Sequence, residues 1–172
     1  MKGIFENFPD LYHGVALFSC RASAKNIQRV IISIFYRINR GEALKLPILS
    51  SQGIQLFLEV GIAEGLAFNF IDDEEKDRWL SLLENASFKT LDFLCIARYY
   101  ISEGEKRKPL KFDYYMLRFI FGSETIELII YHEKGTRRLS IEDLIKMLSE
   151  KINEELIKMG EAPLKIETLR AF

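Results

Sequence analysis

The sequence predicts an α+β fold, in which an antiparallel-rich sheet has its helices packed on one face. Two observations carry this prediction: short runs in which apolar and polar residues alternate, and capped segments in which apolar residues recur at helical spacing. With 172 residues, of which 48% are hydrophobic and 28% charged, the chain is long enough to bury one sizeable core. We therefore expect a single α+β domain spanning residues 1–172.

The expected elements follow the order strand, helix, strand, strand, helix, strand, strand, strand, helix. The first six match a ferredoxin-like βαββαβ core, and a β-hairpin and a long C-terminal helix would follow them. In a sandwich of this kind the helices cover one face of the sheet. The opposite face then needs solvent, a partner or a ligand.

The first strand and the first helix have the clearest local signals in the N-terminal half. Residues 12–20 form a compact β-rich run, which predicts a strand. Ser23 is a good N-cap for a helix that continues to about Asn39, because apolar residues recur along it at helical spacing. Gly41 suits the position just beyond the end of that helix.

The segment from Ile54 to Ile71 allows two interpretations. As strands, it places alternate apolar residues on one face and turns near Gly61 and Gly65. As a helix, it would carry both glycines at a cost of about 1 kcal/mol each relative to alanine. We favour two strands, followed by a short helix that Asp72 or Asp73 opens, that has acidic residues in its first turn and that continues to about Asn85.

A hairpin is predicted where Phe121, Gly122, Ser123 and Glu124 join two apolar runs. Glycine at the first central position suits a two-residue type II′ turn. That turn sets Arg118 opposite Glu127, an opposite-charge pair worth roughly 0.2–1 kcal/mol. The strand before this hairpin is expected over residues 91–101, and residues 103–110 resemble a linker.

The last predicted helix begins at Ser140 and carries an apolar stripe as far as Met159. Gly160 ends it, and Pro163 prevents it from resuming. The remaining residues 161–172 are expected to form either an added strand or an arm onto a second subunit.

The sheet face opposite the helices is apolar for a solvated surface. We expect this face either to form an interface between copies of the chain or to be packed under another element, through Leu94, Ile96, Met116, Ile120 and Ile129. The sequence thus favours a non-catalytic binding or assembly protein that acts as a homo-oligomer, with no heterologous partner identified.

Nucleic acid is the first alternative, although a net charge of −1 gives no global attraction to it. The candidate cations form a basic loop and an arginine pair: Lys106, Arg107, Lys108, Lys111, Arg137 and Arg138. The neighbouring aromatic residues are Tyr99, Tyr100, Phe112, Tyr114 and Tyr115. Cations contact phosphates and exposed rings stack on unpaired bases, so this combination predicts an accessory protein that binds RNA or single-stranded DNA.

The second alternative is a small enzyme with His13 or His132 in a cleft beside a carboxylate. Neither histidine has a second ligand at metal-binding spacing, and the chain has no nucleophile elbow or phosphate-binding loop. We therefore expect no catalytic residue, no metal and no cofactor. Polar residues in or beside strands would contribute if they shared a cleft: Glu59, Glu64, Asn69, Asp92 and Arg98.

Cysteine use and hydropathy bear on location. Cys20 and Cys95 lie in apolar runs, which predicts buried free thiols in a reducing compartment rather than a disulfide framework. The run from Leu46 to Phe70 is interrupted by polar residues and is a poor membrane span. We expect a cytoplasmic protein without a membrane partner.

Overall fold

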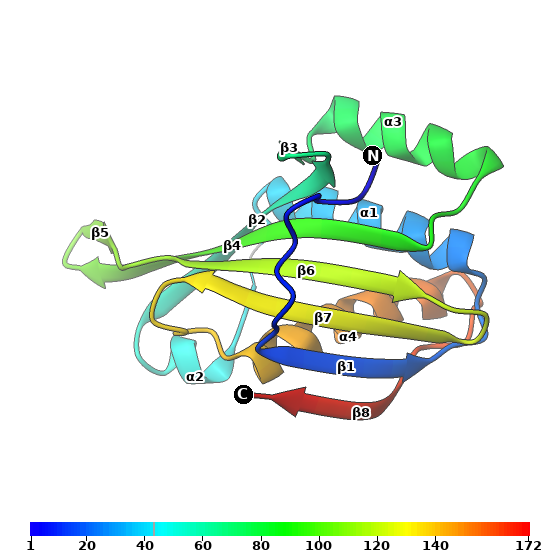
Figure 1. Cartoon of the computed structure of the whole chain (residues 1–172). Coiled ribbons are helices and arrows are strands. Elements are labelled where there is room, and N and C mark those ends of the chain that lie inside the picture. The colour runs from blue at the N-terminus through cyan, green and yellow to red at the C-terminus, as the bar shows by residue number, and fades with distance from the viewer. Residues whose placement is uncertain (43) are drawn as a thin grey trace.

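An open antiparallel sheet of eight strands is the central element of the computed structural model, which describes residues 1–42 and 44–172 (Figure 1). Its strands run β3-β2-β4-β6-β7-β1-β8, and β5 pairs with β4 beyond the end of β6. The bounds are β1 (Gly14–Ser19), β2 (Ile54–Glu64), β3 (Ala67–Phe70), β4 (Thr90–Glu103), β5 (Lys106–Pro109), β6 (Asp113–Phe121), β7 (Thr125–Lys134) and β8 (Lys165–Ala171).

Four helices accompany the sheet within the described residues: α1 (Ala24–Asn39), α2 (Pro47–Ser50), α3 (Asp73–Asn85) and α4 (Ile141–Lys158). Helices α1 and α4 lie on one face of the sheet, behind it in Figure 1. Ser23, Asp72 and Ser140 each cap a helix through a side-chain oxygen that accepts a backbone N–H. The α+β class, the antiparallel sheet and these three helices are therefore as the sequence predicts.

Alternation along the strands determines the two faces of the sheet. On β4, the buried residues Phe93, Cys95 and Ala97 point into the core, while Leu94 and Ile96 between them are half-exposed. We call the face without α1 and α4 the open face. Its side chains form the candidate functional surface.

The N-terminal segment, residues 1–13, crosses the open face in front of β4, β6 and β7 before it enters β1 (Figure 1). The fully buried carboxylate of Asp92 holds it there by accepting the backbone N–H of Phe5 at 2.8 Å. Arg118 binds the same carboxylate with two hydrogen bonds of 2.8 Å and lies 4.2 Å from the centre of the Phe8 ring. The segment therefore covers part of the open face.

The ferredoxin-like order is not confirmed. Strand β1 pairs with β7 and β8, both antiparallel, and is separated from β4 by β6 and β7. The long helix α4 is also not the last element, because residues 165–171 continue into β8. This strand pairs with β1 of the same chain, so the tail is an added strand of the sheet.

The predicted register of the β6–β7 hairpin is wrong by two residues. Phe121 pairs with Ile126 and Gly122 donates its N–H to the Thr125 carbonyl, so the two-residue turn is Ser123-Glu124. Gly122 is not among the glycines with positive φ, which a type II′ turn at that position requires. A shift of two leaves every side chain on its predicted face, but Arg118 pairs with Asp92 and not with Glu127.

The interpretation of residues 54–71 as two strands is confirmed by β2 and β3. The linker expected over residues 103–110 is wrong, because Lys106–Pro109 form β5 and extend β4 as a hairpin. No helix in the described part of the chain is long and apolar enough to cross a membrane.

Candidate binding surface on the open face of the sheet

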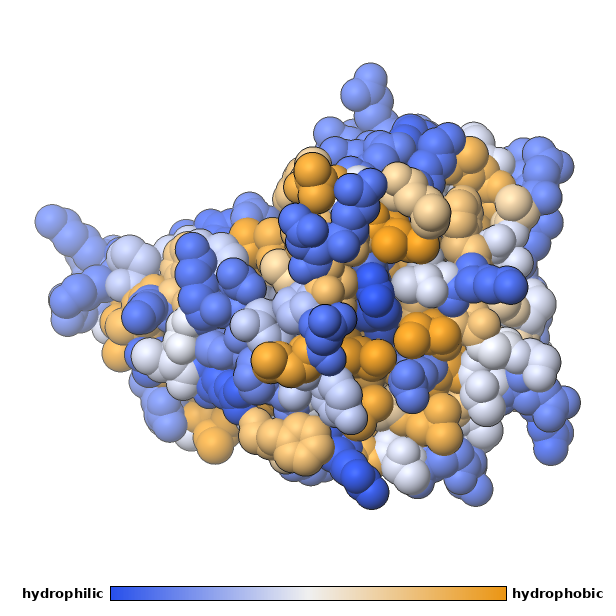
Figure 2. Space-filling view, viewed as in Figure 1, coloured by the Kyte–Doolittle hydropathy of each residue, from blue (hydrophilic) through white to orange (hydrophobic). Residues whose placement is uncertain are grey.

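The five residues expected at an interface all lie on the open face. Ile120 is 36% exposed, and Leu94, Ile96, Met116 and Ile129 are half-exposed. Figure 2 shows apolar side chains gathered over the middle of this face, with charged groups between them. A hollow of about 190 Å³ beside Leu94 and Ile96 is lined mostly by apolar groups of β2 and β3, together with Glu59, and includes the ring of Phe70, which is 47% exposed.

A second surface occupies the end of the open face beside β5. It contains four half-exposed rings and four cations, and we call it the aromatic–basic surface: Phe57, Tyr100, Phe112, Tyr114, Arg98, Arg107, Lys111 and Lys134. The rings of Phe57 and Phe112 flank that of Tyr100 edge to face, at centroid distances of 5.9 and 6.0 Å. The guanidinium of Arg107 lies 5.3 Å from the centre of the Tyr100 ring.

The basic hairpin, Lys106, Arg107 and Lys108, projects from this surface and is exposed to solvent. In Figure 2 the corresponding end of the molecule is hydrophilic. Glu103 lies opposite Lys106, Glu105 lies in the turn, and Glu59 pairs with Arg98 at 3.3 Å. The local excess of positive charge is therefore small, and any electrostatic attraction to an anion will be screened readily by salt.

A fully buried carboxylate, Asp113, lies between Phe112 and Tyr114 and points away from the open face. Its two oxygens accept four hydrogen bonds: from Tyr99 Oη (2.5 Å), His132 Nε2 (2.8 Å) and the backbone N–H groups of Arg137 (2.7 Å) and Arg138 (2.8 Å). Burial disfavours the charged form, but these donors hold the pKa of Asp113 below its usual value. Successive residues of an extended chain alternate sides, so this anchor keeps both rings on the open face.

The same network fixes the start of α4. The backbone of Leu139 donates its N–H to Tyr99 Oη at 2.7 Å, and its carbonyl accepts the hydroxyl hydrogen of Tyr115. Gly135 has φ +114°, and a Cβ there would overlap the Asp113 carboxylate. The turn from β7 to α4 is thus built around Asp113.

His13 lies beside this network in a defined tautomer. The backbone N–H of His132 donates to His13 Nδ1 at 2.9 Å, so the proton of the neutral imidazole is on Nε2. Burial, Arg137 and His132 together lower the pKa of His13. Its own carbonyl accepts the N–H of Phe172, which ties β1 to the end of the chain.

This arrangement predicts a pH dependence of stability. Since the pKa of His13 is lower in the folded protein than its ordinary value of 6.5, the unfolded chain binds more protons as the pH falls below about 6.5. The free energy of unfolding should therefore decrease in that range. His13→Asn keeps an acceptor for the His132 N–H but does not titrate, so its urea-unfolding profile should depend less on pH between about 7 and 5.5. Identical pH profiles for the wild type and His13→Asn would contradict the assignment of this pH dependence to His13.

Arg137 and Arg138, which were predicted to contact nucleic acid, lie in the turn from β7 to α4. Their backbones bind Asp113, and the guanidinium of Arg137 donates to the carbonyl of Phe172. Tyr99 and Tyr115 are buried in the core and are not available for stacking. Of the predicted nucleic-acid residues, the structure therefore brings Arg107 and Lys111 together with exposed rings, while Lys106 and Lys108 flank Arg107 on the hairpin.

The polar residues proposed for a catalytic cleft do not form one cluster. Glu64 binds Arg78 at 2.6 Å and accepts from Asn69 at 3.3 Å, whereas Asp92 binds Arg118 and Glu59 binds Arg98. His132 does meet a carboxylate, as the enzyme alternative requires, but Asp113 is 0% exposed and already accepts four hydrogen bonds. We infer that the His132–Asp113 pair has a structural role and helps to hold the turn from β7 to α4.

Two further observations concern reactive groups. Among the residues that the structure describes, no group of three or more His, Cys, Asp and Glu side chains could hold a metal ion. Cys20 and Cys95 are buried free thiols, as predicted, and burial raises the pKa of Cys95 to about 12. A thiol with this pKa is a poor nucleophile near neutral pH.

Sequence reasoning missed Lys134, Phe57, Gly135 and the carboxylate of Asp113. Lys134 and Phe57 join the surface only because the end of β7 lies beside β6 and the start of β2 lies beside β4. The sequence did contain a signal for Asp113, which is a charged residue between two aromatic residues at the start of a strand. A charged residue in a buried position of this kind needs hydrogen-bond or ion-pair partners.

No protein-family model, no curated protein and no solved structure matches this chain.

Proposed function

We propose that the protein is a non-catalytic binding protein that takes single-stranded RNA or DNA on the aromatic–basic surface. One observation carries the proposal: four half-exposed rings and a projecting basic hairpin share one end of a sheet face that α1 and α4 leave open. Rings accept unpaired bases by stacking, and the cations contact the phosphates.

The chemistry of the surface favours a single strand over a duplex. Bases in a duplex are stacked on one another, so their faces are not free to meet Tyr100 or Phe112. Phe57 and Tyr100 are half-exposed, and the Arg107 guanidinium lies against both rings. A base can therefore replace the solvent on the exposed part of these rings without a rearrangement of the sheet. The small local excess of charge predicts weak binding without sequence preference, with a dissociation constant of about 10⁻⁴–10⁻⁶ M at physiological salt.

Neutralising the basic hairpin tests the proposal. In the triple variant Lys106→Gln, Arg107→Gln and Lys108→Gln, three phosphate contacts are lost. The slope of log K against log salt should therefore become shallower by about 2 for a single strand. The measurement is fluorescence anisotropy with a labelled single-stranded RNA pool.

The matched control removes three cations from α4 and β8: Lys146→Gln, Lys158→Gln and Lys165→Gln. It changes the net charge by the same amount but leaves the aromatic–basic surface intact. An equal loss of affinity and of salt slope in both triple variants would show that net charge alone drives binding. It would refute the aromatic–basic surface as the binding site.

A second candidate function, assembly as a homo-oligomer, is supported by the apolar patch in the middle of the open face. Leu94, Ile96 and the exposed ring of Phe70 border a shallow apolar hollow that a second copy of the chain could fill. A lysine placed in this patch would be desolvated in the interface, so Met116→Lys or Ile129→Lys should yield monomers.

Sedimentation velocity of the wild type and the two lysine variants measures the oligomeric state. Lys89→Glu, at an exposed position before β4, is the control for a surface charge change. An oligomer that persists in both lysine variants would remove this patch as the interface, and a monomeric wild type would refute the candidate.

A further inference from the structure

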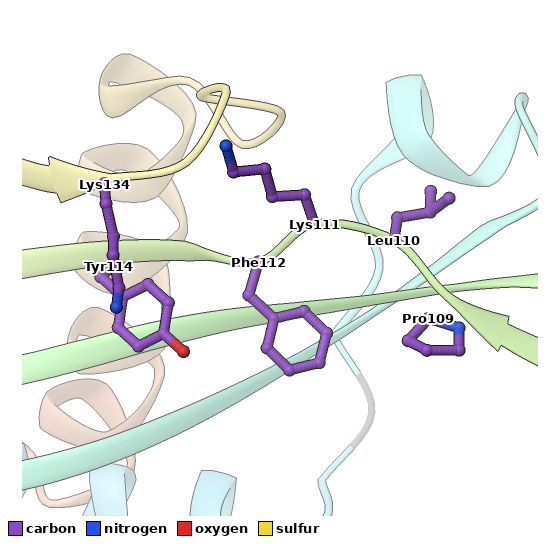
Figure 3. A pocket seen from close by; sticks show the side chains of 6 residues that line it. All are labelled: Pro109, Leu110, Lys111, Phe112, Tyr114 and Lys134. Carbon is purple, nitrogen blue, oxygen red and sulfur yellow. The ribbon is translucent and has the colours of Figure 1, made fainter.

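A hollow of about 490 Å³ lies where the chain passes from β5 to β6. It is lined by Pro109, Leu110, Lys111, Phe112, Tyr114 and Lys134. Figure 3 shows the rings of Tyr114 and Phe112 side by side, with Pro109 beyond Phe112. The ammonium of Lys134 lies beside the Tyr114 ring, 4.3 Å from its centre.

The walls of this hollow select for two properties in one ligand. The rings and Pro109 offer flat apolar surface, which an inorganic anion would leave uncovered. The Lys134 ammonium, which lies over the Tyr114 ring and is exposed to solvent, offers a point charge that suits a phosphate. A planar aromatic group that carries a phosphate satisfies both, and a nucleotide is such a group.

The hollow is also continuous with the rest of the aromatic–basic surface. The ring centroids of Phe112 and Tyr100 are 6.0 Å apart, and the Arg107 guanidinium lies 5.3 Å from the centre of the Tyr100 ring. Pro109 pairs with Tyr100 across β5 and β4. Rings and cations therefore follow one another from Lys134 to Arg107.

The geometry points to a base subsite: we propose that this hollow holds one unstacked base of the bound strand against Phe112 and Tyr114, with Lys134 on its phosphate. The neighbouring nucleotide then lies on Tyr100 and Arg107. This inference rests on the proposed function and adds to it the position of one nucleotide and the path of the strand from Lys134 to Arg107.

The first test maps contacts on the unmodified protein. A single-stranded oligonucleotide with 5-iodouridine is photocrosslinked to the full chain, and the attached residues are identified by mass spectrometry. We expect crosslinks on Phe112 or Tyr114. Crosslinks confined to other regions would overturn the subsite. The proposed function would still stand in that case, because the oligonucleotide would have bound to the protein.

Variants supply an independent readout by anisotropy. Phe112→Ala and Tyr114→Ala should each weaken binding roughly 5- to 150-fold, because one stacking contact is lost. Tyr114→Phe keeps the ring and should bind like the wild type. Lys134→Gln should make the salt slope shallower by about 0.7, whereas Lys89→Gln, at a distant exposed site, should not change it. Unchanged affinity in both alanine variants would overturn the subsite.

If the oligonucleotide does not bind at all, the proposed function fails and the subsite is tested alone. Uridine monophosphate is then titrated against the protein by NMR. Saturable shifts that disappear in Phe112→Ala would support the hollow as a nucleotide site without the strand-binding function. No shifts at millimolar nucleotide would overturn it.

Discussion

Replacing Asp113 with alanine is expected to lower the free energy of unfolding by about 3–5 kcal/mol, the range for removing one partner of a buried, hydrogen-bonded charge. Two backbone N–H groups, those of Arg137 and Arg138, would lose their acceptor, and so would His132 and Tyr99. For a chain of this length the melting temperature should fall by roughly 10 °C. Urea and thermal unfolding measure both quantities.

Two controls sharpen this prediction. Asp77→Ala removes an exposed carboxylate from α3 and should change stability by no more than about 0.5 kcal/mol. Because the pKa of Asp113 is lowered in the folded protein, its contribution is present above pH 3.8 and is lost as the pH falls below that value. The difference between wild type and Asp113→Ala should shrink there. A loss below about 0.5 kcal/mol at neutral pH would contradict the role of Asp113 as an anchor.

Replacing Asp92 with alanine should produce the second large effect, a loss of about 2–3 kcal/mol. The variant leaves the Arg118 guanidinium without its two hydrogen bonds and the Phe5 N–H without an acceptor. We place the loss below that of Asp113→Ala because the Arg118 side chain is 26% exposed and can be partly rehydrated. Urea unfolding measures the change in stability.

The position of the N-terminal segment gives a second readout for the same pair. Hydrogen exchange at the Phe5 amide should accelerate in Asp92→Ala, since that N–H is bound by Asp92. Arg118→Ala should also destabilise, and the double variant should lose less than the sum of the two single variants. If the stability losses of the two single variants are strictly additive and hydrogen exchange at the Phe5 amide is unchanged, the Asp92–Arg118 pair does not hold the N-terminal segment.

The two buried aspartates are connected to the candidate function in different ways. Asp113 keeps Phe112 and Tyr114 on the open face, so its loss should weaken oligonucleotide binding as well as stability. Asp92 holds the segment that covers the middle of the open face, away from the basic hairpin. Its loss should affect assembly more than nucleic-acid binding.

The sequence was sufficient for most of the elements, although not for α2 or β5, and for the two faces of the central strands. Period-two alternation identified β4, and Ser23 and Ser140 located the starts of α1 and α4. These features depend on residues that are close in the chain. The five apolar residues of the open face were assigned correctly for the same reason, even though the hairpin register was wrong by two.

Strand order and the site could be predicted only in part, because they depend on contacts between distant residues. Alternation indicates which face of a strand is buried but not which strand lies beside it, so nothing local placed β1 between β7 and β8. The meeting of Asp113 with Tyr99 and His132 follows from the pairing of β6 with β4 on one side and β7 on the other. The basic hairpin was recognised, but Lys134 and Phe57 could join it only once β2, β4, β6 and β7 were aligned.

Binding of single-stranded RNA at two salt concentrations tests whether the aromatic–basic surface binds single-stranded nucleic acid. Four phosphate contacts, by Lys106, Arg107, Lys108 and Lys134, predict a slope near −2.8 for a single strand. The affinity of the wild-type protein for labelled single-stranded RNA should therefore fall roughly 50-fold between about 50 and 200 mM salt. No binding at the lower salt with about 10⁻⁴ M protein, the weak end of non-specific association, would contradict binding at this surface.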